Sequence, residues 1–120
     1  MIKVGVLGAR GRMGTEVVTA ITDAPDLELV AALDLGDSLD ALLSNGAQVV
    51  VDFTTPDSVM ANLEFLITHN INAVIGTTGF DDARIAKITS LLASSKSGVL
   101  IAPNFAIGAV LMMEFATKAA

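Results

Sequence analysis

Short apolar runs alternate with helical patterns along this chain. The first run, residues 2–7, is continuous and rich in β-branched side chains, which is typical of a strand buried on both faces. Between the runs, apolar residues recur at a spacing of three or four, which indicates helices. The pattern predicts strands at residues 2–7, 27–33, 48–53, 71–75 and 99–102, and helices that carry residues 13–21, 38–43, 59–67, 85–92 and a last one from about 107.

Local signals mark where several helices begin and end. Ser38 is a candidate N-cap, and Asn45-Gly46 ends the short helix that follows it. Thr55-Pro56 places a proline in the first turn of the next helix, and Asp81 or Asp82 begins the one after. The side chains expected to face the core from these two helices are Val59, Leu63, Leu66 and Ile67, then Ile85, Ile88 and Leu92.

The order of elements predicts the fold class. Strands that alternate with helices, and that are apolar without a period of two, form a parallel sheet with helices on both faces. Because the crossovers between such strands are right-handed, we expect an α/β domain with a Rossmann-like doubly wound parallel sheet.

Composition restricts the function without naming it. The chain has 120 residues, 52% of them hydrophobic and 17% charged, which fits one folded domain and excludes disorder. No apolar run reaches the roughly 20 residues of a membrane span, so no membrane partner is expected. A net charge of −6 argues against nucleic acid as a partner. The absence of cysteine fits a cytoplasmic protein, and because a strand pattern begins at Ile2 we expect no leader peptide.

A glycine-rich turn, residues 8–14, lies between the first predicted strand and the first helix. Its pattern is Gly-x-x-Gly-x-x-Gly rather than the more common Gly-x-Gly-x-x-Gly. At such a turn glycine permits a sharp bend and a close approach, and the helix N-terminus offers unpaired N–H groups to a pyrophosphate. The alternative is a tight turn whose glycine serves helix packing, and Gly5, inside the strand, suits that role better.

Asp34 ends the second predicted strand, 26 residues after Gly8. A carboxylate there accepts the ribose hydroxyls of NADH and repels the 2′-phosphate of NADPH. Arg10 and Arg12, however, are two of only seven basic residues, and both lie in the glycine-rich turn. They would neutralise a pyrophosphate or bind a 2′-phosphate, unless they are solvated surface side chains. We therefore expect both NADH and NADPH to bind.

Three more loops follow strands, at residues 52–56, 76–80 and 102–106. Ligands of open parallel sheets lie at this edge. Gly76, Thr77 and Thr78 offer hydroxyl and N–H groups to a carboxamide or a carboxylate, while Asp52 is interpreted as a strand-end acceptor that holds its loop. Phe53, Phe80 or Phe105 is a candidate wall for a nicotinamide ring, and each has core packing as its alternative. No metal site is expected, because no ligand cluster has suitable spacing.

These segments resemble a known family. Residues 4–14, Val51-Asp52-Phe53-Thr54, Gly76-Thr77-Thr78-Gly79-Phe80 and residues 102–108 are together similar to 4-hydroxy-tetrahydrodipicolinate reductase (dihydrodipicolinate reductase) of actinobacterial type. The resemblance implies NADH- and NADPH-dependent reduction of a cyclic dicarboxylate in diaminopimelate and lysine biosynthesis, by a homotetramer. It implies cofactor contacts at Gly8, Ala9, Arg10, Gly11, Arg12, Met13, Asp34, Phe53, Gly76, Thr77, Thr78, Ala102, Pro103, Asn104 and Phe105, with Thr78 also beside the substrate.

The resemblance stops short of the catalytic groups. The family's His-His pair, nearby Lys and Ser-Gly-Thr motif belong to a second domain and do not occur in this sequence. The single histidine, His69, falls at the end of a helix on the opposite side of the sheet. We therefore expect residues 1–106 to be a dinucleotide-binding domain, residues 107–120 to begin a hinge and helix toward a missing domain, and this chain alone to be inactive.

Two other functions compete with this interpretation. One is a non-catalytic nucleotide- or CoA-binding Rossmann module, which has no need of the acid at Asp34. The other is a nicotinamide dehydrogenase of aspartate or homoserine type, against which the Gly-Thr-Thr-Gly-Phe and Ala-Pro-Asn-Phe motifs count.

Overall fold

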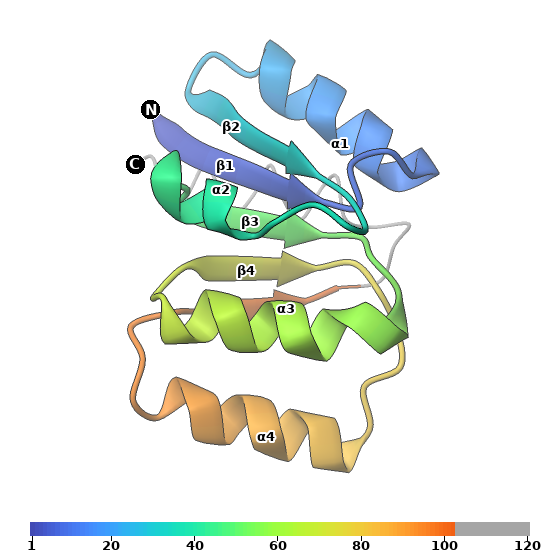
Figure 1. Ribbon diagram of the computed structural model, residues 1–120, viewed down its shortest axis with the longest axis vertical. Coiled ribbons are helices and arrows are strands. Elements are labelled where there is room, and N and C mark those ends of the chain that lie inside the picture. Colours follow the sequence, from blue (N-terminus) through green and yellow to red (C-terminus); the bar gives the residue numbers. More distant parts are fainter. Residues whose placement is uncertain (103–120) are drawn as a thin grey trace.

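The computed structural model describes residues 1–102 as an alternation of strands and helices (Figure 1). The predicted final helix, and Pro103, Asn104 and Phe105 before it, lie outside the described residues. The elements are β1 (Ile2–Leu7), α1 (Arg12–Asp23), β2 (Leu27–Leu33), α2 (Asp40–Ser44), β3 (Val49–Asp52), α3 (Pro56–Thr68), β4 (Asn72–Ile75), α4 (Asp82–Leu92) and β5 (Val99–Ile101).

All the pairings between these strands are parallel, and the strand order is β2-β1-β3-β4-β5. The chain first moves from β1 outward to β2, then returns past β1 to β3 and continues to β5 on the other side. The predicted Rossmann-like, doubly wound parallel sheet is therefore confirmed. The direction of winding reverses between β1 and β3, and ligands of such sheets bind at this switch point.

Each face of the sheet has its own apolar core. On one face Val4 and Val6 of β1 pack with Val17 and Ile21 of α1. On the other face Leu7 packs with residues of α2 and α3. Figure 1 shows α1 beside β1 and β2, with α3 and α4 toward the opposite edge of the sheet, near β4. Helices thus cover both faces, as the unbroken apolar strands predict.

Gly5 serves packing, as its position inside β1 predicted. A Cβ atom there would lie 2.6 Å from Cδ2 of Leu42, a fully buried residue of α2. A side chain at residue 5 would displace the end of Leu42, so glycine lets α2 pack closely on the strand.

Two local predictions were wrong. Ser38 is not the N-cap of α2: Leu39 takes that position, and the Ser38 hydroxyl accepts a hydrogen bond from the Asp40 amide at 3.2 Å, so the helix starts later. Ile85 does not face the core but is 42% exposed. The reason is that α4 lies at the edge of the sheet, where only one narrow side of the helix, with Ile88, is covered.

No helix among residues 1–102 is long and apolar enough to cross a membrane.

Candidate cofactor site

The carboxyl ends of β1, β2 and β3 meet beside the switch point of the sheet. Gly8 follows β1, Asp34 follows β2 and Phe53 follows β3. Two small hollows, of about 110 and 180 Å³, open between these ends. Both are lined by Gly8, Asp34, Leu35, Thr54 and Ser58.

Two glycines of the turn are required by the protein's own backbone. Gly8 has a φ of 77°, and a Cβ atom there would lie 2.8 Å from the carbonyl of Phe53. At Gly14 a Cβ atom would overlap the carbonyl oxygen of Gly8 and lie 2.9 Å from the Cα atom of Ala9. Gly14 therefore lets α1 pack directly on the end of β1.

Gly11 is different, because nothing in the described fold requires it. Its φ is −75°, which any residue adopts, and the nearest atom to an added Cβ is the Gly8 oxygen at 3.4 Å. Its side of the turn faces the larger hollow, which it helps to line. The missing side chain leaves space at the surface of the hollow rather than inside the fold.

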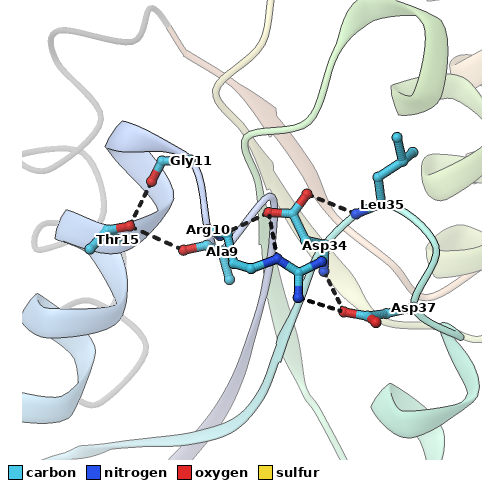
Figure 2. A network of polar contacts seen from close by, with 7 residues as sticks. All are labelled: Ala9, Arg10, Gly11, Thr15, Asp34, Leu35 and Asp37. Carbon is cyan, nitrogen blue, oxygen red and sulfur yellow. Dashed lines mark hydrogen bonds and ion pairs between the residues drawn. The ribbon is translucent and has the colours of Figure 1, made fainter.

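The N-terminus of α1 offers its amides to that space. Gly11 is the N-cap, and no side chain among the described residues caps this end of the helix. The Thr15 hydroxyl instead donates to the carbonyl oxygens of Gly11 at 2.7 Å and Ala9 at 3.3 Å (Figure 2). The first N–H groups of a helix have no partners within the helix and carry its partial positive charge. This end is therefore suited to an anion.

The Asp34 carboxylate lines the same hollow and is held in place by the backbone. Its two oxygens accept hydrogen bonds from the backbone amides of Leu35 at 2.7 Å and Arg10 at 2.8 Å (Figure 2). These bonds, and then the nearby Arg10 guanidinium, lower the pKa of Asp34 below its usual value. Asp34 is therefore a fixed, ionised acceptor with lone pairs left for a ligand.

Sequence reasoning missed two neighbours of Asp34. Leu35 is 80% exposed although it is apolar, and it lines both hollows. Asp37 lies 3.9 Å from Nη1 of Arg10, whose Nε atom is 4.0 Å from Asp34. The signal available was the Asp-x-Gly-Asp spacing, because Gly36 with a φ of 91° turns the chain back on itself.

Asp52 holds the loop after β3, as predicted. The side chain is fully buried, and its Oδ1 atom accepts from the amide of Thr54 at 2.7 Å and from its hydroxyl at 2.6 Å. Oδ2 accepts from the Asn62 amide at 3.0 Å. Burial raises the pKa of Asp52, although these three hydrogen bonds oppose the shift. Asn62, which sequence reasoning did not single out, completes this network from α3.

The ends of β4 and β5 lie along the same edge but do not line these hollows. Phe53 links them to the site, because its ring lies where a Cβ atom of Gly76 would be. Thr77 is buried and Thr78 is exposed. Ala102 is buried and donates its amide to the Ile75 carbonyl at 2.9 Å.

Other candidates have ordinary structural surroundings. Phe80 is partly buried against the core, and Met13 packs against the core below α1. Arg12 is exposed and makes no ion pair with residues 1–102. His69 caps the C-terminus of α3, away from the site as predicted, and its ring stacks on Phe65. Within the described part of the chain no three His, Cys, Asp or Glu side chains converge on a metal position.

The parallel sheet, the glycine-rich turn and the acid after β2 define a Rossmann-type nucleotide-binding domain. The family described as "Dihydrodipicolinate reductase, N-terminus" matches residues 2–105. The chain belongs to this family, as the four sequence motifs predicted.

Known relatives agree with this assignment. The chain is 61% identical to 4-hydroxy-tetrahydrodipicolinate reductase of Corynebacterium efficiens over 120 residues, which are 99% of this chain and 48% of that protein. It therefore spans about half the length of the curated relatives it matches. A dipicolinate-bound dihydrodipicolinate reductase from Paenisporosarcina sp. TG-14 has a TM-score of 0.78 and 35% identity, over 100% of this chain and 54% of that one.

Similarity to a dehydrogenase of aspartate type is limited to the fold. Aspartate dehydrogenase from Thermotoga maritima has a TM-score of 0.63 but only 17% identity, over 84% of this chain and 45% of that one.

Proposed function

We propose that this chain is the domain that binds NADH and NADPH in a full-length dihydrodipicolinate reductase. The observation that carries the proposal is Gly11. Its backbone conformation is ordinary and the fold has room for a side chain, so its glycine is explained by a ligand that lies against it. A pyrophosphate fits this place, because it is an anion and needs the uncapped amides of α1.

The adenosine end is assigned to the part of the hollows lined by Asp34 and Leu35. The ionised Asp34 would accept hydrogen bonds from the ribose hydroxyls, and the exposed Leu35 would cover an apolar face of the adenine. Along the glycine-rich turn, Gly8, Ala9, Arg10, Arg12 and Met13 would complete the contacts.

The nicotinamide end is assigned to the neighbouring strand ends. The Phe53 ring over Gly76 would form one wall, with Thr77, Thr78 and Ala102 beside it, and with Pro103, Asn104 and Phe105 outside the described residues. When bound, the nicotinamide supplies a hydride. The chain's own contribution is to fix its position, which requires the loops after β3 and β4 to be rigid.

The full-length protein would act on a small cyclic dicarboxylate. Support comes from the Paenisporosarcina relative, whose structure holds dipicolinate, and from the exposed Thr78 hydroxyl at this edge. The proton donor would come from a second domain, since this sequence has only His69, at the opposite side of the sheet. We extend the proposal to a cytoplasmic homotetramer on the strength of the family resemblance.

Calorimetric titration of this chain with NADH and with NADPH tests the proposal. We expect saturable one-to-one binding, and we expect Gly11→Ala to weaken both nucleotides by about tenfold or more, because the new methyl group holds the pyrophosphate away from the amides. Folding should change little, since alanine at an N-cap costs about 1 kcal/mol or less relative to glycine.

The matched control is Gly98→Ala, which adds a methyl group at another uncrowded position, 3.5 Å from the Asn72 side chain and remote from the hollows. It should bind as the wild type does. Folded wild-type chain that binds neither nucleotide would overturn the proposal.

Asp34→Ala should weaken the binding of NADH and of NADPH to different extents. Loss of the ribose acceptor is expected to weaken NADH binding by about tenfold. The affinity for NADPH should fall less, because the charge that repels its 2′-phosphate is removed together with the acceptor. The same titrations measure both effects, with Asp23→Ala at the far end of α1 as the control. Equal losses for NADH and NADPH would contradict the role of Asp34 at the ribose.

A further inference from the structure

The guanidinium of Arg10 lies between two carboxylates. Its Nε atom is 4.0 Å from Oδ2 of Asp34, and its Nη1 atom is 3.9 Å from Oδ2 of Asp37 (Figure 2). Asp34 is the residue assigned above to the ribose. Asp37 has no assigned role, yet it comes as close to the guanidinium as Asp34 does.

Asp34 and Asp37 form the hydrogen bonds that close the turn between them. The Asp34 amide donates to Oδ2 of Asp37 at 2.9 Å, and the Asp37 amide donates to the Asp34 carbonyl at 2.9 Å. The Asp37 carboxylate is therefore fixed beside the ribose position, with 40% of its side chain exposed. Its charge acts on any ligand that reaches Asp34.

A 2′-phosphate is the ligand group most sensitive to this charge. It replaces one of the ribose hydroxyls that would donate a hydrogen bond to Asp34. The phosphate would therefore lie where the Arg10 guanidinium already faces the carboxylates of Asp34 and Asp37. A phosphate there would compete with Asp37 for the Arg10 guanidinium. A ribose hydroxyl has no charge, so the two carboxylates do not repel it and it leaves the contact between Arg10 and Asp37 intact.

We propose that Asp37 is a specificity residue that disfavours the 2′-phosphate, and so sets the affinity of this domain for NADPH relative to NADH. The inference rests on the proposed function. Asp37 does so by holding Arg10 and by placing a second negative charge near the ribose.

Asp37→Asn tests the charge without breaking the turn. An asparagine oxygen still accepts from the Asp34 amide, and the carboxylate charge is gone. The control is Asp26→Asn, which makes the same change in net charge just before β2, at the opposite end of that strand. Calorimetric titrations with NADH and NADPH are run on both variants and on the wild-type chain.

We expect Asp37→Asn to tighten NADPH by about fivefold, as removal of one charge a few ångströms from a phosphate predicts. NADH should change by less than about twofold, and the NADPH gain should shrink at high salt because both groups are partly exposed. Asp26→Asn should leave both affinities unchanged.

An NADPH affinity that does not rise, or a rise shared equally by NADH, overturns the role of Asp37 while leaving the proposed function in place. If neither nucleotide binds the wild-type chain, the proposed function fails and this inference fails with it.

Discussion

Gly14→Ala is expected to lower the free energy of unfolding by about 3 kcal/mol or more. The new methyl group would overlap the Gly8 carbonyl oxygen and lie 2.8 Å from the carbonyl carbon, both of them backbone atoms. No rotamer relieves the contact, so α1 must move off β1 and lose part of the core around Val17 and Ile21. Alanine would otherwise favour a helix by about 1 kcal/mol, which is too little to compensate.

Urea unfolding measures this change, and Gly11→Ala is the matched control three residues away. The control should keep an unfolding midpoint near that of the wild type, since its methyl group meets only one atom, at 3.4 Å. A midpoint of Gly14→Ala that equals the control's would show that the helix adapts and that the close contact is not limiting.

Asp52→Ala should have the next largest effect, a loss of about 3 kcal/mol. It leaves the Thr54 amide, the Thr54 hydroxyl and the Asn62 amide without their acceptor in a partly buried place. Asp52→Asn should cost about 1 kcal/mol, because the asparagine oxygen still accepts from Thr54 and the buried charge is removed. Urea unfolding at neutral pH compares the two variants.

The pH dependence isolates the charge of Asp52. Because burial raises its pKa above the ordinary value of 3.8, the folded chain holds this proton more tightly than the unfolded chain does. Its contribution to stability is full below the ordinary pKa and is lost as the pH rises through the raised pKa. The stability of wild type relative to Asp52→Asn should therefore fall over that acid range. A difference that rises with pH would contradict the raised pKa.

The regular part of this fold could be predicted from the sequence because it depends on local patterns. Continuous apolar runs located the strands to within two residues. The helix start was narrowed to Asp81 or Asp82, and the structure has Asp81 as the N-cap, where its side chain accepts from the Arg84 amide at 2.8 Å. Ile85 was placed wrongly because helical spacing gives a face but not how much of that face the sheet covers.

The candidate site was predictable where its residues follow directly on a strand, and less so elsewhere. The turn from Gly8 to Gly14 and the acid Asp34 have fixed places relative to β1 and β2. Asn62 reaches Asp52 only because α3 folds back along the sheet, and Asp37 meets Arg10 only because Gly36 turns the chain. Such contacts join residues by tertiary structure, which no short motif records.

The switch point between β1 and β3 has a consequence for local unfolding. The loops assigned to the dinucleotide follow β1, β2, β3 and β4, so they belong to crossovers that can open separately. A ligand that contacts all four loops is lost when any one of them opens. Nucleotide binding should therefore slow hydrogen exchange together at amides as far apart in sequence as Arg10, Thr54 and Thr77, and make separate openings into one cooperative event.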